Sequence, residues 1–228
     1  MRQTITRTRS GAFMWAPVRW AVCAALVAGG ATACSKDDTG TDKPDVLSTS
    51  QVCDGTLTSA GAAALKHIGG KDGYTEPEDP GRWSLESAAK GLQESAISRY
   101  ECSLYPEGDK SGRPLLTIGF MARQSHPDPM EAAKEKDHDQ LFYPLGVYAS
   151  ATGYEATSLF FECPTKRPEG GTPYVKAEMY SAKNKMNADS TGKDRMTILN
   201  DMSRALAKEL GCAAQAKLPA EVPDALPG

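Results

Sequence analysis

Helical spacing of apolar residues occurs in three stretches of the chain. Within residues 56–70, 84–97 and 194–210 the apolar positions recur at intervals of three and four, which is the spacing of one buried face of an α-helix. Thr58 and Ser84 stand where side-chain N-caps are expected, and glycines follow the first and last stretches. We therefore expect three helices that each bury one face.

A period of two replaces the helical spacing in two other stretches. Residues 99–104 alternate, a turn rich in Pro and Gly follows, and 115–122 is largely apolar, which together predict a β-hairpin. Its pattern Tyr-Glu-Cys, Pro-Glu-Gly, Pro-Leu-Leu returns as Phe-Glu-Cys, Pro-Glu-Gly, Pro-Tyr-Val within 158–181. A second hairpin is expected there, by duplication or by convergence. The predicted fold class is α+β, with an antiparallel sheet of about four strands from two similar hairpins, covered by helices.

Residues 124–153, between the hairpins, are the least regular part of the chain. A short helix is expected at 128–136, where Asp-Pro forms a good start signal. The most aromatic stretch, 141–148, follows, and its proline and glycine argue against a central strand. This stretch is either a packed loop or edge strand, or an aromatic binding surface. The candidate surface residues are Phe142, Tyr143 and Tyr148.

The first 33 residues have the pattern of a secretory signal. Four arginines and no acidic residue precede an apolar run of 13 residues, 21–33, which is shorter than the roughly 20 residues of a spanning helix. Ala31-Thr32-Ala33-Cys34 then resembles a lipobox, so we expect cleavage after residue 33 and acylation of Cys34. Ala31 stands where Leu is usual, and the same residues suit the ordinary signal peptidase. Plain secretion and an uncleaved anchor therefore stay open as alternatives.

Composition divides the remaining chain into a linker, one domain and a tail. Residues 34–52 are polar and predict a flexible linker, 53–213 a single α+β domain, and 214–228 a Pro-rich disordered tail. Removing the four signal arginines from 26 basic residues leaves 22 against 29 acidic ones, a net charge of −7. This charge argues against nucleic acid and anionic lipid head groups as partners. Contact with the membrane is expected through the N-terminal lipid anchor alone.

Six cysteines occur in the chain, of which Cys23 leaves with the signal and Cys34 would carry lipid. An even number of the others in an exported chain indicates two disulfides, and their wide spacing does not suit a zinc motif. These four residues are Cys53, Cys102, Cys163 and Cys212. Three pairings are possible. The intervals 53 to 102 and 163 to 212 are both 49 residues, and each joins a helix end to a strand. We predict the pairs Cys53–Cys102 and Cys163–Cys212.

The sequence contains no recognisable catalytic motif. It has no Ser placed as in a nucleophile elbow, no glycine-rich phosphate loop and no His-Glu-x-x-His. His67 is expected on a helix surface, His126 in a turn and His138 in a solvated charged run. We expect no metal and no cofactor.

Acidic residues leave two narrower alternatives. The turn-rich loop 71–82 contains a run of three acidic residues at 76–79, and a calcium site is the alternative there to a solvated loop. These are Glu76, Glu78 and Asp79. Glu101 and Glu162 occupy equivalent places on the two hairpins, and they would form a glycosidase-type pair only if the fold brought them together.

Several short motifs accompany the lipobox. They are Cys-Asp-Gly at 53–55, Phe-Tyr-Pro-Leu-Gly-Val-Tyr at 142–148, Phe-Phe-Glu-Cys-Pro at 160–164, Pro-Tyr-Val-Lys-Ala-Glu at 173–178 and Met-Thr-Ile-Leu-Asn at 196–200. Together they resemble a family of uncharacterised exported lipoproteins of actinobacteria, over most of the mature chain. The resemblance implies a cell-surface location and brings no activity with it.

The function that these features favour is a lipid-anchored, non-enzymatic binding domain on the outer face of the cytoplasmic membrane. Its partner would be an envelope protein or a cell-wall component. One alternative is a carrier that holds a small apolar ligand between sheet and helices. Another is a cell-wall hydrolase, which requires an acid–base group that the sequence does not reveal.

Overall fold

The computed structural model describes residues 45–78, 82–94, 100–134, 139–153, 155–166 and 170–227. The predicted signal, Cys34 and the first part of the linker lie outside the described residues, as do Asp79 and His138. The described residues all belong to one folded unit, Asp42–Gly228.

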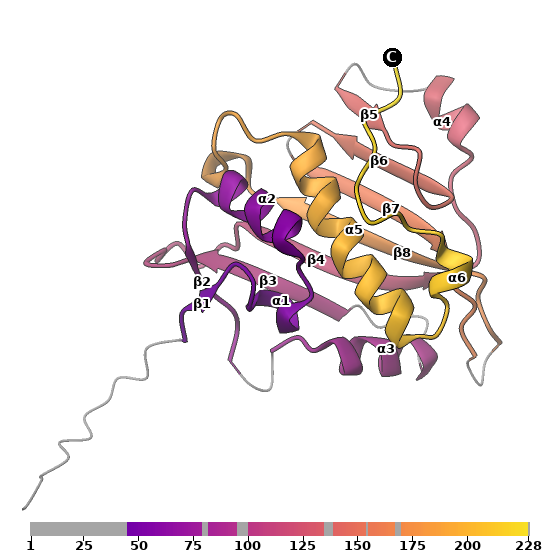
Figure 1. Cartoon of the computed structure of the whole chain (residues 1–228), viewed down its shortest axis with the longest axis horizontal. Coiled ribbons are helices and arrows are strands. Elements are labelled where there is room, and N and C mark those ends of the chain that lie inside the picture. Colours follow the sequence, from indigo (N-terminus) through magenta and orange to yellow (C-terminus); the bar gives the residue numbers. More distant parts are fainter. Residues whose placement is uncertain are drawn as a thin grey trace, which may run out of the picture. The chain divides into compact units, whose positions relative to one another are not determined.

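Eight antiparallel strands form one sheet in the order β1-β2-β3-β4-β8-β7-β6-β5 (Figure 1). The strands are β1 (Leu47–Ser48), β2 (Gly73–Thr75), β3 (Tyr100–Pro106), β4 (Leu116–Arg123), β5 (Gln140–Phe142), β6 (Tyr148–Thr152), β7 (Ala156–Glu162) and β8 (Tyr174–Ser181). β1 and β5 are therefore the two edges of the sheet.

Both predicted hairpins are confirmed and lie next to each other in the sheet. β3 pairs with β4 and β7 with β8, and the pairing of β4 with β8, from Leu116↔Ser181 to Arg123↔Tyr174, joins the two. The expectation of about four strands is wrong, because β1 and β2 extend one side and β6 and β5 the other. β1, β2 and β5 have two or three residues each, and β6 consists mainly of small residues. Such strands are too short, or too poor in large apolar residues, to show the hydrophobic alternation from which a strand is predicted.

The three predicted helices are confirmed as α2 (Ser59–Gly69), α3 (Leu85–Glu94) and α5 (Gly192–Glu209). Thr58 caps α2 by accepting the N–H of Gly61, and Ser84 accepts the N–H of Ser87 at the start of α3. α5 lies across the sheet in Figure 1 and contacts β6, β7 and β8, with α2 and α3 packed against it. The remaining described helices are α1 (Val52–Gly55), α4 (Pro129–Lys134), α6 (Ala213–Ala216) and the 3₁₀ turn Lys183–Lys185. The expected continuation of α3 beyond Glu94 lies outside the described residues.

The core lies between the sheet and the helices. Because side chains alternate between the faces of a strand, the register aligns Cys102, Ile118 and Met179 on the covered face, and all three are at most 1% exposed. α5 adds the apolar face that its spacing predicts, and Thr191 and Asp194 form a capping box at its start. Among the described helices, none combines the length and apolar character needed to cross a bilayer.

Both predicted disulfides are present. Cys53–Cys102 joins α1 to β3, with the Cα atoms 5.7 Å apart, and Cys163–Cys212 joins the end of β7 to the turn after α5, with the Cα atoms 5.2 Å apart. Each bond therefore ties a helical segment to the sheet, as the sequence interpretation expected.

The segments before and after the expected domain also belong to the fold. Residues 47 and 48, expected in the linker, form β1 against β2, and Val52 is 0% exposed. The tail expected to be disordered at 214–228 is ordered over its described residues: 214–216 belong to α6, and 217–227 lack regular structure but are held against the domain. Asn200 Nδ2 donates to the carbonyl of Pro219 at 2.9 Å, and Val222 is only 7% exposed. Buried apolar side chains in both segments explain why composition alone misassigned them.

Candidate functional site

The aromatic segment forms a pocket together with two other parts of the chain. The pocket has a volume of about 380 Å³ and lies at the β5–β6 connection. Its described lining residues are Pro129, Phe142, Tyr143, Pro144, Leu145, Gly146, Val147, Tyr148, Ala149, Leu226 and Pro227. None of these residues carries a charge, so the pocket offers mainly apolar surface with a few polar groups at its wall.

A constrained loop between β5 and β6 shapes the pocket. Tyr143 N–H donates to Ala149 C=O at 3.0 Å, Leu145 N–H to Tyr143 C=O at 2.9 Å, and Val147 N–H to Phe160 C=O at 2.8 Å. Gly146 has φ +60°, and a Cβ atom there would stand 2.2 Å from the Phe160 carbonyl oxygen. Only glycine fits this close approach. The Gly in the sequence pattern is therefore what allows the loop to reach β7.

Aromatic rings pack edge to face along one wall. The Phe142 and Tyr148 centroids lie 6.0 Å apart at 77°, and those of Tyr148 and Phe160 lie 5.7 Å apart at 80°. This geometry is favourable for aromatic pairs. The Tyr148 hydroxyl accepts from Ser150 Oγ at 3.1 Å and from Gln140 Nε2 at 3.4 Å. The ring is thus held in place by both packing and hydrogen bonds.

The predicted surface residues line a recess and do not protrude. Tyr143 is 5% exposed and Tyr148 is 8% exposed, whereas Phe142 is partly exposed. Burial raises the pKa of the Tyr143 hydroxyl, although the nearby Arg195 guanidinium acts in the opposite direction. Tyr143 therefore stays neutral well above physiological pH, which suits an uncharged pocket.

The C-terminal tail closes one side of this pocket. Leu226 N–H donates to the Phe142 carbonyl at 2.8 Å, which places Leu226 and Pro227 over the end of β5. Asp224 pairs with Lys193 at 2.5 Å, and the Asp224 side chain is 91% exposed. The sequence interpretation missed this part of the wall, because no local pattern links the tail to residues 142–149.

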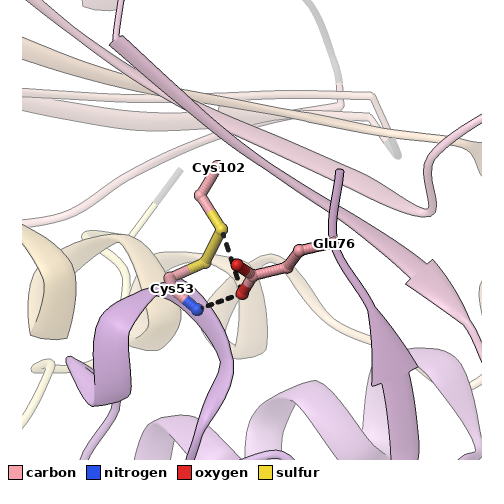
Figure 2. A group of neighbouring side chains, drawn as sticks. All are labelled: Cys53, Glu76 and Cys102. Atoms are coloured by element: carbon pink, nitrogen blue, oxygen red, sulfur yellow. Dashed lines mark hydrogen bonds between the residues drawn. A yellow bond between two sulfur atoms is a disulfide. The ribbon is translucent and has the colours of Figure 1, made fainter. Parts of the chain in front are cut away.

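A second, polar pocket of about 750 Å³ lies beside the Cys53–Cys102 disulfide. Glu76 lines it and is 8% exposed, so the expectation that this acidic residue belongs to a solvated loop is wrong. Figure 2 shows its carboxylate against the disulfide: Oε1 accepts the Cys53 N–H at 2.5 Å and lies 3.8 Å from Cys102 Sγ. The other oxygen lies 3.6 Å from Arg82 Nε.

Cys53, Glu76 and Cys102 lie close enough together to suggest a metal site, but their chemistry excludes one. Their candidate ligand atoms lie within 4.8 Å of one another. The two sulfur atoms are joined in a disulfide, whereas metal coordination by cysteine needs the thiolate. Glu76 instead holds the backbone of Cys53, which has φ +47°. The cluster is therefore a structural support for a strained turn.

The carboxylates of the hydrolase alternative are far apart. Glu101 lies opposite Gly119 on β4, and Glu162 lies opposite Tyr174 on β8. They share a face of the sheet, but β4 and β8 separate their strands. Three strand spacings alone amount to about 14 Å, beyond the roughly 5–9.5 Å that glycosidase carboxylates require. This arrangement does not support a glycosidase pair.

The described histidines do not form an acid–base centre with a nucleophile. His67, at the end of α2, lies between two carboxylates: Nδ1 is 3.1 Å from Asp194 Oδ2 and Nε2 is 3.2 Å from Asp189 Oδ2. His126 packs edge to face on Tyr174, with the ring centroids 4.8 Å apart. Both positions agree with the expectation of a surface helix residue and a turn residue.

Comparison with protein-family models, with curated proteins and with solved structures finds no match to this chain. The interpretation of the aromatic pocket therefore depends on its own geometry.

Proposed function

We propose that this protein is an exported, non-enzymatic binding protein, and that the aromatic pocket is where it takes up an apolar group of its partner. The observation that carries the proposal is the pocket itself, about 380 Å³ in volume and lined without charge. Ligand pockets commonly measure about 300–1,000 Å³ and combine apolar walls with a few polar groups. A carrier of a small apolar molecule is the second candidate, and the same volume favours it.

We further propose that the protein belongs to the resembled group of actinobacterial lipoproteins and is anchored through Cys34 to the outer face of the cytoplasmic membrane. Two disulfides support an oxidising compartment. The lipobox-like sequence before Cys34 supports the anchor. Intact-mass measurement of the membrane-extracted protein should give a chain that starts at Cys34 with acyl groups attached, and Cys34→Ala should release the protein from the membrane fraction. A mature chain without acyl mass would contradict the anchor and leave plain secretion.

Filling the pocket tests the proposed binding site. Val147→Trp places a large ring in the cavity from a partly exposed lining position. It should weaken binding of the fluorescent dye anilinonaphthalene sulfonate about tenfold, because the substituted ring takes the space of the apolar rings of the dye. Fluorescence titration of the folded protein measures this change.

Leu141→Trp is the matched control. Leu141 lies in β5 next to the lining residue Phe142, is 44% exposed and is not itself a lining residue of the pocket. It should leave the dye affinity unchanged. Thermal melting of both variants checks that they are folded. Equal dye affinity in the wild-type protein and Val147→Trp would show that this pocket is not the binding site.

A further inference from the structure

The described C-terminal residues lie beside the edge strand β5, to which they donate one backbone hydrogen bond. Tyr143 N–H donates to the Ala149 carbonyl at 3.0 Å, and Gly153 N–H donates to the Asp139 carbonyl at 3.1 Å. The backbone N–H and C=O groups of odd-numbered β5 residues therefore point toward β6. Because the hydrogen-bonding direction alternates along a strand, the backbone groups of Gln140 and Phe142 point outward from the sheet. Leu226 N–H donates to one of them, the carbonyl of Phe142.

The tail is buried at Val222 and more exposed beyond it, where Ala225 is partly buried against the core. Val222 is 7% exposed, whereas Leu226 is 51% exposed although it lines the pocket. The ion pair of Asp224 with Lys193 is exposed on both sides, at 91% and 48%, and exposed pairs contribute little to stability. A competing segment can therefore displace residues 224–227 without unfolding the domain.

We propose that the partner group bound at the pocket is an extended peptide segment of another protein, with an acidic residue two positions before an apolar residue that precedes proline. This inference rests on the proposed function of the pocket and names its ligand class. The chain's own Asp224-Ala225-Leu226-Pro227 is an intramolecular competitor of that segment.

Three features of the site recognise the three parts of such a peptide. The outward backbone groups of β5 accept an added strand, which is a common mode of peptide recognition. Lys193, released from Asp224, pairs with the acidic residue of the peptide. The uncharged residues of β5 and the β5–β6 loop, which Leu226 and Pro227 cover in this structure, take the apolar side chain and the proline, so that the peptide completes the pocket wall in place of the tail. A small apolar molecule would use only the last of these features.

The competition has a measurable consequence. A tethered segment acts at an effective concentration of roughly millimolar, and the apparent affinity of a free peptide falls with the fraction of protein whose site is open. A chain that ends at Pro223 keeps the buried Val222 and loses the competitor. It should bind a fluorescein-labelled peptide of residues 220–228 about tenfold more tightly than the full-length domain does, as measured by fluorescence anisotropy.

Peptide variants give the matched controls. A peptide with Leu226→Asp should lose binding, since a carboxylate would then lie against the uncharged pocket wall. One with Asp224→Lys should bind several-fold more weakly, because it faces Lys193. Full-length protein with Leu226→Ser provides the same test without truncation: it should bind the peptide more tightly than wild type. Melting curves establish that both proteins are folded.

The outcomes separate this inference from the function it builds on. If the shortened chain binds anilinonaphthalene sulfonate in a manner sensitive to Val147→Trp but does not bind the peptide, the pocket stands and the peptide inference fails. If it binds neither probe, both fail. If full-length protein forms a dimer that the truncation abolishes, the tail serves a second copy of the chain, and the proposal of a separate partner is overturned.

Discussion

His67 is a single side chain that joins three segments of the chain. It lies on α2 and faces Asp189, in the loop before α5, and Asp194, in the first turn of α5. Only the doubly protonated imidazole can donate to both carboxylates at once. The hydrogen bond to Asp189 is the largest cause that raises the pKa of His67, and the hydrogen bond to Asp194 raises it further. The hydrogen bond from His67 in turn lowers the pKa of the Asp189 carboxyl. The bridge therefore depends on pH through the charge of His67 and through the charge of Asp189.

Stability should follow the titration of His67. Because its pKa is raised from 6.5 on folding, its contribution is complete below about pH 6.5 and is lost as the pH rises through the folded pKa. Asp189 contributes above its ordinary value of 3.8 and loses its contribution as the pH falls through its lowered pKa. The melting temperature should therefore decline from pH 6 to pH 8, and His67→Gln should flatten that decline. A histidine NMR titration with a midpoint below 6.5 would contradict the assignment.

Glu76 shows how one side chain holds several elements together. It follows β2, its carboxylate accepts a hydrogen bond from Cys53 in α1, and it lies against Cys102 in β3. Cys53 and Asp54 both have positive φ, at 47° and 59°, a conformation that costs about 1–2 kcal/mol for each non-glycine residue. The disulfide and Glu76 together compensate for that cost. Asp54 in turn accepts the Leu85 N–H at 3.0 Å at the start of α3.

Removing the Glu76 carboxylate should destabilise the domain. Glu76→Ala leaves the buried Cys53 N–H without its acceptor, which should cost about 1–3 kcal/mol in the free energy of unfolding. Glu76→Gln retains an oxygen acceptor and should cost less. Glu78→Ala, at an exposed position two residues later, is the control and should change stability by less than about 0.5 kcal/mol. Equal urea midpoints for Glu76→Ala and Glu78→Ala would show that the hydrogen bond contributes nothing.

The elements themselves follow from the sequence to the extent that each buries one face. α5 places Leu199, Met202 and Leu206 in the core at the spacing that the sequence shows. β3 buries Cys102 and Leu104, two of the alternating residues that predict it. The sequence did not predict β6, because Tyr-Ala-Ser-Ala-Thr follows a loop that contains Pro and Gly and is buried along most of its length. A strand covered on both faces shows no alternation.

At the scale of the molecule, the two hairpins belong to one cooperative unit. The sheet runs without interruption from β1 to β5, and α5 contacts α2, α3, β6, β7 and β8. The two disulfides lie in different parts of this unit, one near α1 and one at the end of α5. Cross-links of equal sequence separation, 49 residues, thus stabilise each half of the chain.

Each disulfide should contribute similarly to the stability of the whole domain. Closing a loop of this length contributes about 4 kcal/mol in the chain-entropy model. The double variants Cys53→Ser with Cys102→Ser, and Cys163→Ser with Cys212→Ser, should each lose about this amount and still unfold in one transition. Circular dichroism and tryptophan fluorescence in urea should report the same midpoint for each variant. Separate transitions for the two probes would mean that the hairpins fold independently.

Local patterns in the chain were enough to predict three helices and two hairpins, and the equal intervals favoured one of three possible cysteine pairings, which the structure confirms. Periodicity records which face of a segment is buried, and cysteine number and spacing are written directly in the chain. Tertiary structure alone decided the edge strands, the burial of Glu76 and the closure of the aromatic pocket by Leu226. These features arise from contacts between distant segments, such as residues 142–149 with the tail, and no local pattern encodes a contact whose partner lies elsewhere in the chain.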